Sequence, residues 1–202
     1  MVWLAKTVVI TGGATDLGQA IGKRFADQGA MVVLADHARA RLLAARAAVG
    51  GLVYPALADV RDESHLARLF SALDAVDVLV CCSSAAPAGA NALEAMPASA
   101  LVDLFEVGVY GSYWAARHAL PKMRAGGSIV FVSRGLARAG AQRVVGGAVD
   151  ALTRALAAEI AGRAVRVNGV ALAERDDDAV EAVQFLAGAS AINGAVVAFG
   201  AA

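Results

Sequence analysis

The regular alternation of apolar runs with helical stretches constrains the fold of this chain more than any other feature. The runs are apolar at nearly every position, without the polar–apolar alternation of a half-exposed strand. Strands that are buried on both faces of a parallel sheet have this pattern. The predicted strands are Thr7–Thr11, Met31–Asp36, Leu52–Ala58, Val78–Cys82, Ser128–Ser133, Val165–Ala171 and Ala195–Phe199.

Helical stretches separate these strands, and two of them carry clear start signals. Asp62 precedes one stretch, and the carboxylates at 176–178 lie where the positive end of a helix dipole is expected. These three carboxylates also allow a metal site, although adjacent side chains on a helix do not converge on one ion. The predicted helices are Leu17–Gln28, Arg39–Val49, Glu63–Leu73, Ala98–Met123, Arg143–Ala161 and Ala179–Leu186. This order predicts a single α/β domain over residues 1–202, with parallel strands joined by right-handed crossovers.

Composition and charge argue against several classes of protein. The 18 basic and 18 acidic residues give a net charge of zero, and no basic stripe favours nucleic acid as a partner. The sequence has no signal-peptide pattern and no apolar run of membrane-spanning length, so we expect a cytoplasmic protein without a membrane partner. Cys81 and Cys82 are neighbours on a predicted strand and point to opposite faces, so we expect two buried thiols and no metal. Hydrophobic residues reach 58%, mostly Ala and Val, and either extra subunit contacts or genome composition accounts for this share.

A glycine-rich turn, Thr11–Gly18, joins the first predicted strand to the first predicted helix. Backbone N–H groups in such a turn approach a pyrophosphate at the helix N-terminus. Asp36 ends the second predicted strand, where a carboxylate accepts hydrogen bonds from an adenosine ribose and repels a 2′-phosphate. The combination predicts a Rossmann-type fold with an NAD site. The alternative is a tight turn that only packs the helix onto the sheet.

Motifs along nearly the whole chain resemble those of the short-chain dehydrogenase/reductase family. Thr11–Gly18 resembles the family's Thr-Gly-x-x-x-Gly-x-Gly loop, and Asp59-Val60 resembles the Asp-Val pair that helps to hold adenine. Further matches, in order, are Asp77–Val80, Gly127–Val130, Leu152–Ala157, Arg166–Asn168 and Gly194. The resemblance implies a doubly wound, seven-stranded parallel sheet. The residues that it implies for a remnant NAD site are Thr11, Gly12, Gly18, Asp36, Asp59 and Val60.

The cofactor loops depart from the family pattern at two places. Asp16 stands where the family has the middle glycine of the loop. Its carboxylate either points toward the pyrophosphate and repels it, or turns outward and caps the helix. Cys81–Ser84 replaces the family's Asn-Asn-Ala-Gly after the fourth strand. We therefore expect NAD binding by this chain to be weak or absent.

The positions that carry catalysis in the family hold other residues here. The resemblance places the family's catalytic Asn at Gly108 and its Ser at Arg134. Its catalytic Tyr falls at Gln142 and its Lys at Gly146. Ser133 precedes Arg134, so a shift of one residue would restore the serine.

No realignment supplies the Tyr–Lys pair, because no tyrosine follows Tyr113 and no lysine follows Lys122. Hydride transfer to a carbonyl needs a proton donor at the substrate oxygen, and in the family a Tyr hydroxyl beside a Lys fills this role. Removing groups that act as a unit costs on the order of 10⁴-fold in rate. The family's long substrate-covering segment is also missing, since Val170–Ala173 leads almost directly into the last predicted helix. We predict that the isolated chain is not an enzyme.

Charged side chains near the vacated positions allow two interpretations. Three arginines there form either an anion-binding patch or ordinary exposed side chains. They are Arg134, Arg138 and Arg143. The histidines have no partner at metal-ligand spacing, so we expect surface or helix residues. They are His37, His65 and His118.

The helices that pair subunits in this family keep small and apolar faces here. The residues around Gly146-Gly147 that leave one face free of bulk are Val144, Val145, Ala148, Val149 and Ala151. The leading hypothesis is a non-catalytic subunit that forms a dimer or tetramer with an active short-chain dehydrogenase, within an NAD-dependent oxidoreductase complex. Such a complex would be similar to heteromeric dehydrogenases with one inactive subunit. Two alternatives stay open: an NAD(H)-binding sensor, and an active reductase that uses Ser133 or Arg134.

Overall fold

The predicted doubly wound sheet is present in the computed structural model, which describes residues 3–84, 96–133, 140–172 and 177–199. Seven strands lie in the order β3-β2-β1-β4-β5-β6-β7, and every neighbouring pair is parallel. The strands are β1 (Thr7–Thr11), β2 (Met31–Asp36), β3 (Val53–Leu57), β4 (Val76–Cys81), β5 (Met123–Ser133), β6 (Val165–Leu172) and β7 (Val196–Phe199). The strand order reverses between β1 and β4, and ligands bind at such switch points in open α/β sheets.

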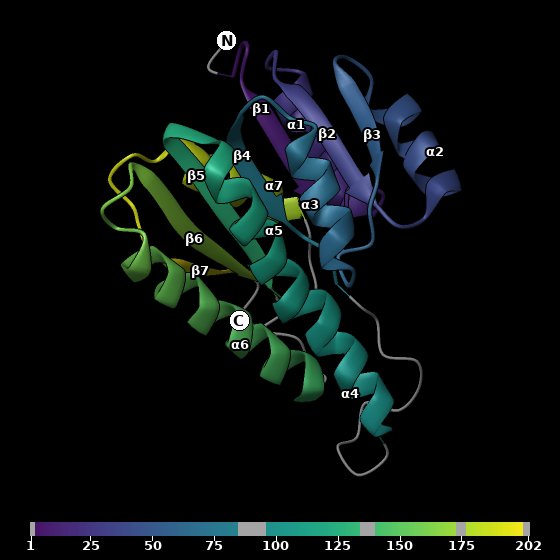
Figure 1. Cartoon of the computed structure of the whole chain (residues 1–202), viewed down its shortest axis with the longest axis vertical. Coiled ribbons are helices and arrows are strands. Elements are labelled where there is room, and N and C mark those ends of the chain that lie inside the picture. Colours follow the sequence, from purple (N-terminus) through teal and green to yellow (C-terminus); the bar gives the residue numbers. More distant parts are fainter. Residues whose placement is uncertain (1–2, 85–95, 134–139, 173–176, 200–202) are drawn as a thin grey trace.

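Helices cover both faces of the sheet (Figure 1). α1, α2 and α7 pack on one face, and α3, α5 and α6 pack on the other. The helices are α1 (Asp16–Ala26), α2 (Arg39–Val49), α3 (Glu63–Ser71), α4 (Ala98–Phe105), α5 (Gly111–Ala119), α6 (Gly140–Glu159) and α7 (Asp177–Gly188). Most predicted helices differ from these only at their ends.

Successive residues of each strand belong to different halves of the core. Val8 and Ile10 pack with α1, α2 and α7, whereas Val9 between them packs with the helices on the opposite face. Fully buried phenylalanines anchor both halves: Phe25 in the first, and Phe70 and Phe131 in the second. Because both faces are covered, both sets of strand residues are mostly apolar, which explains the continuous apolar runs in the sequence.

The structure corrects the predicted helix Ala98–Met123. α4 passes into a π-helical turn at Glu106–Tyr110, and α5 ends in a 3₁₀ turn at Leu120–Lys122. A π turn changes the helical period without interrupting the helix, so the apolar pattern does not reveal it. It contains Gly108, where an added Cβ would lie 2.8 Å from Val145 Cγ1 on α6. The glycine therefore permits close contact between this turn and α6.

The connection after β6 is short, as predicted. Only residues 173–176 separate Leu172 at the end of β6 from Asp177 at the start of α7. The predicted α7 start is also corrected, from Ala179 to Asp177. No length remains here for a long segment over the carboxyl ends of the strands.

A buried carboxylate joins the amino ends of three strands, at the edge of the sheet opposite the switch point. Asp77 on β4 accepts hydrogen bonds from Thr7 N (2.9 Å), Lys6 Nζ (3.0 Å) and Arg124 Nη1 (2.6 Å). Burial raises the pKa of Asp77, but the Thr7 amide and the two cations outweigh burial and hold this pKa below its ordinary value. The ionised form of Asp77 therefore stabilises the fold.

We expect Asp77→Asn to lower the free energy of unfolding by about 1–2 kcal/mol at neutral pH, because two half-exposed cations lose a buried anion. The folded-state pKa lies below the unfolded one, so the carboxylate's contribution is fully present above about pH 4 and is lost as the pH falls through the folded-state pKa. Urea unfolding at a series of pH values measures both effects. Asp27→Asn, in the exposed Lys23–Asp27 pair, is the control and should cost less than about 0.5 kcal/mol. An equal loss in the two variants would contradict the assignment.

Candidate functional site

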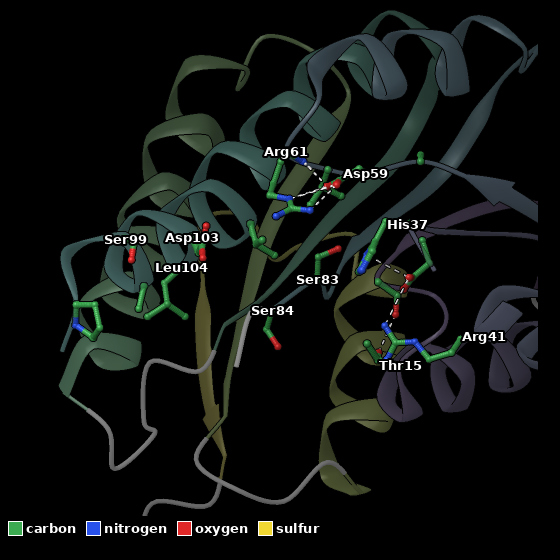
Figure 2. Close-up of a pocket in the computed structure, with 17 residues that line it drawn as sticks. Thr15, His37, Arg41, Asp59, Arg61, Ser83, Ser84, Ser99, Asp103 and Leu104 are labelled. Atoms are coloured by element: carbon green, nitrogen blue, oxygen red, sulfur yellow. Dashed lines mark hydrogen bonds and ion pairs between the residues drawn. The ribbon is translucent and has the colours of Figure 1, made fainter. Parts of the chain in front are cut away.

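A large cavity lies at the carboxyl ends of β1, β2, β3 and β4, beside the switch point of the sheet. Its volume is about 590 Å³, within the range of small-molecule sites. Figure 2 shows Asp59 and Arg61 on one side, His37 and Arg41 on another, and Ser83 and Ser84 between them. The cavity is lined by Gly12, Thr15, Asp36, His37, Arg41, Ala58, Asp59, Val60, Arg61, Ser83, Ser84, Pro97, Ser99, Ala100, Asp103, Leu104 and Val107.

The glycine-rich turn forms the floor of this cavity and is held by close backbone contacts. Gly12 has φ +71°, and an added Cβ would lie 2.7 Å from Ser83 N. An added Cβ at Gly18 would meet the backbone of Gly12 and Gly13. Thr15 caps α1, because its Oγ1 accepts a hydrogen bond from Gly18 N (3.1 Å) and donates one to Gly12 O (2.7 Å). The two glycines are thus needed for packing, whatever the turn binds.

Asp36 holds the same turn from the end of β2. Its Oδ2 accepts a hydrogen bond from Ala14 N (3.2 Å), and its Oδ1 accepts one from Ala38 N (3.0 Å). His37 Nδ1 lies 3.4 Å and Arg41 Nη2 4.0 Å from Oδ1. The Asp36 side chain is only 4% exposed, yet a carboxylate offers about four acceptor positions and the two amides take two of them. Capacity remains for a ribose hydroxyl at the cavity wall.

Asp59, just beyond the end of β3, is engaged by a cation on its own turn. Arg61 Nη2 donates to Asp59 Oδ2 (2.7 Å), Arg61 Nε contacts both carboxylate oxygens, and the Arg61 amide donates to Oδ1 (3.0 Å). These hydrogen bonds hold the pKa of Asp59 below its ordinary value, against the opposing effect of burial. The carboxylate is therefore ionised at neutral pH, and Arg61 adds a positive group to the cavity.

The structure brings four of the six predicted cofactor residues to this cavity: Gly12, Asp36, Asp59 and Val60. The other two, Thr11 and Gly18, do not line the cavity and instead make contacts within the glycine-rich turn and with the end of β4. The Thr11 side chain is 1% exposed, and its carbonyl accepts hydrogen bonds from Cys82 N (3.1 Å) and Sγ (3.0 Å). Gly18 packs against Gly12, as described above.

The sequence interpretation missed the basic lining residues, which are His37, Arg41 and Arg61. Their positions one to five residues after Asp36 and Asp59 were the available signal.

A smaller cavity of about 190 Å³ lies at the ends of β1, β4, β5 and β6. Asp16 contributes its only charged lining group among the described residues; Thr15, Cys82, Val132 and Leu172 lie nearby. Because Thr15 caps α1, the alternative that Asp16 acts as the cap is wrong. Asp16 is instead the exposed first residue of the helix, at the mouth of this second cavity.

Three of the four vacated positions lie together, and the fourth, Arg134, is outside the described residues. Gly108, Gln142 and Gly146 line one cavity with Ser133, although they come from three different elements. That cavity measures only about 30 Å³, room for roughly one or two water molecules. Val145, Val149 and Leu104 fill the surrounding space. Among the described residues, these positions therefore share one small cavity.

Ser133 is already engaged at this small cavity. Its Oγ donates to Asp150 Oδ1 (2.9 Å), and the serine is 5% exposed. Arg134 and Arg138 lie outside the described residues, and Arg143 is exposed on α6.

Among the described residues, no group of three or more His, Cys, Asp or Glu side chains is placed to hold a metal ion. In the same part of the chain, no helix is long and apolar enough to cross a membrane.

The two cysteine side chains are buried, as predicted. Burial raises the pKa of the Cys81 thiol to about 12, despite a hydrogen bond with Thr11 that lowers it. The Cys82 thiol contacts the Thr11 carbonyl. A thiol with so high a pKa carries almost no thiolate at neutral pH, so Cys81 is unsuited to nucleophilic chemistry.

The apolar residues of α6 divide between two faces, which corrects their assignment to a single face. Val145 and Val149 are buried against the protein, whereas Val144 is 59% exposed and Ala151 is exposed. Nothing lies within 4 Å of an added Cβ at Gly147. Tyr110, Tyr113, Leu101 and Val102 add exposed apolar surface on the neighbouring α4–α5 segment (Figure 1). We call the exposed apolar residues of these neighbouring segments the helical face: Leu101, Val102, Tyr110, Tyr113, Val144 and Ala151.

A match to a family sequence profile decides the family of this chain. The sequence profile of the short chain dehydrogenase family matches residues 6–184. The chain belongs to the short-chain dehydrogenase family. Members of this family generally bind NAD or NADP. A short-chain dehydrogenase/reductase from Mycobacterium ulcerans superposes with a TM-score of 0.90 over 98% of this chain and 89% of that one, at 21% identity, which supports the fold.

Two curated relatives within the short-chain dehydrogenases illustrate the degree of similarity. L-fucose dehydrogenase of Mus musculus is 33% identical over 173 residues, which cover 81% of this chain and 63% of that protein. Galactitol 2-dehydrogenase (L-tagatose-forming) of Cereibacter sphaeroides is 34% identical over 174 residues, 80% of this chain and 68% of that protein. The chain thus spans about two thirds of the length of these short-chain dehydrogenases.

Proposed function

We propose that this chain is a non-catalytic subunit that assembles with an active short-chain dehydrogenase into an NAD-dependent oxidoreductase complex. One observation carries the proposal. The positions where the family holds its Asn, Tyr and Lys converge here as Gly108, Gln142 and Gly146 on a cavity of about 30 Å³. The fold that positions a catalytic centre is kept, while its chemistry and its space are gone.

The replaced side chains determine what this centre is able to do. An amide at Gln142 does not release a proton to an alkoxide, and Gly146 carries no charge to lower the pKa of a neighbour. Ser133 retains a hydroxyl, but this hydroxyl donates to Asp150, and a serine beside a carboxylate is a poor acid. Loss of groups that act together costs on the order of 10⁴-fold in rate. The connection from β6 to α7, residues 173–176, is also too short to form a long covering segment that would exclude water.

The helical face supplies the surface for assembly. Exposed apolar side chains on α4–α5 and α6 lie beside positions where small residues permit a second helix to approach. Large contiguous apolar surfaces on a protein mark contacts with other macromolecules. A partner with the same fold would present the matching helices, so a pseudo-symmetric pairing of the two chains buries this face on both sides.

Affinity purification of the full chain from its source cells, followed by native mass spectrometry, tests the proposal. We expect a hetero-oligomer whose second chain is a short-chain dehydrogenase with an intact Tyr-x-x-x-Lys motif. Isolation of only the monomer or only a homo-oligomer, at concentrations found in the cell, would overturn it.

A further inference from the structure

We propose that this chain binds an adenine nucleotide without a nicotinamide group, such as ADP, in the cavity of about 590 Å³. The proposal concerns the isolated chain and does not depend on the partner proposed above. It rests on an imbalance between the two halves of what would be a dinucleotide site. The described residues form a spacious cavity with polar and apolar lining in one half, whereas in the other half they line two smaller cavities.

The large cavity offers each feature that an adenosine phosphate needs. Apolar lining comes from Ala58, Val60, Leu104 and Val107, which suits a planar base. Asp36 retains acceptor positions for ribose hydroxyls beside the glycine-rich turn.

The same cavity favours a phosphate group. Gly12 and Thr15 bring the N-terminus of α1 to the cavity, where the positive end of the helix dipole favours anions. His37, Arg41 and Arg61 add positively charged or protonatable side chains along the wall. The guanidinium groups of Arg41 and Arg61 offset part of the negative charge of the lining carboxylates, so an anionic ligand does not enter a purely acidic site.

The nicotinamide half does not fit in the same way. A dinucleotide continues from its pyrophosphate toward the ends of β4, β5 and β6, where the cavities measure about 190 Å³ and 30 Å³. Both volumes lie below the roughly 300 Å³ at which small-molecule sites begin. Asp16 places a carboxylate at the larger of the two, close to where the second phosphate and ribose would pass. Gln142 and Gly146 provide neither the hydroxyl nor the cation that would hold the second ribose.

This imbalance predicts an unusual order of affinities. In a complete dinucleotide site, the nicotinamide half adds contacts that strengthen binding. Here those contacts are missing, so the adenosine diphosphate part alone should account for the binding of any larger ligand. ADP and ADP-ribose should bind as tightly as NAD⁺, and nicotinamide mononucleotide should not bind.

Isothermal titration calorimetry of the purified full chain with ADP, ADP-ribose, NAD⁺ and nicotinamide mononucleotide tests the proposal. We expect the dissociation constants of ADP, ADP-ribose and NAD⁺ to agree within about threefold. NAD⁺ binding about tenfold or more tighter than ADP-ribose would overturn the proposal, and so would the absence of binding by every adenine nucleotide. Neither result bears on the pairing with an active partner, which a separate purification measures.

Two matched variants locate the ligand. Ala100 on α4 lines the cavity, and Ala98 on the same helix is exposed and does not line it. Ala100→Trp should weaken ADP binding at least about tenfold by filling the cavity, whereas Ala98→Trp should leave it unchanged. Equal binding by the two variants would place the nucleotide elsewhere. If Ala100→Trp does not fold, the order of affinities in the unmodified chain still decides the proposal.

Discussion

Replacement of Ala151 by Arg is expected to abolish co-purification with the catalytic partner while leaving the fold of this chain intact. Ala151 is exposed on α6, so the isolated chain accommodates an arginine there without repacking. At a close helix contact, however, the guanidinium would be buried without a partner. We expect the affinity for the partner to fall on the order of 100-fold or more. Size-exclusion chromatography and a binding titration with the purified partner measure the change.

Ala44→Arg is the matched control for this variant. Ala44 is exposed on α2, beyond β3 and far from the helical face (Figure 1). The same change of charge and size there should leave pairing unchanged, and both variants should unfold at the temperature of the parent chain. Full pairing by the Ala151 variant would show that the helical face is not the contact surface.

Replacement of Gly12 by Ala should strongly destabilise the fold, because it combines backbone strain with a steric clash. The left-handed conformation of Gly12, with φ +71°, costs an alanine about 1–2 kcal/mol. Its Cβ would also lie 2.7 Å from Ser83 N and 2.8 Å from Ser83 Cα, so the backbone must move, at about 1–3 kcal/mol more. We expect the free energy of unfolding in urea to fall by about 3 kcal/mol in total.

Gly126→Ala separates these two contributions. Gly126 has φ +84°, and nothing lies within 4 Å of an added Cβ, so only the conformational cost of about 1–2 kcal/mol remains. The difference between the variants therefore measures how closely the glycine-rich turn approaches the end of β4. If the two losses were equal, the contact with Ser83 would not be as close as described.

Local signals in the sequence were sufficient to predict the strands of the sheet and the position of the glycine-rich turn. Apolar runs fix where strands lie, and Asp36 and Asp59 could be placed because they follow strand ends. The salt bridge from Arg61 to Asp59 was missed because it depends on the conformation of a short turn rather than on a repeating pattern. The π turn at Glu106–Tyr110 could not be predicted from the sequence, because it changes the helical period without a proline that would interrupt the helix.

The faces of α6 could not be assigned from the sequence for a different reason. Apolar residues surround this helix, so its periodicity does not distinguish the buried side from the exposed one. Packing against α4 and the π turn determines which face of α6 is buried. Val145 lies against Gly108, whereas Val144 is exposed. The convergence of Gln142, Gly146 and Ser133 on one small cavity likewise depends on tertiary packing.

The most direct test of the central claim uses the complex with the active partner and removes the partner's catalytic tyrosine hydroxyl by substitution with Phe. If this chain contributes no catalytic group, steady-state turnover of the complex should disappear to background, although every residue of this chain is unchanged. Residual turnover that persists in that complex, and is then lost when Ser133→Ala is introduced here, would show that this chain catalyses the reaction itself.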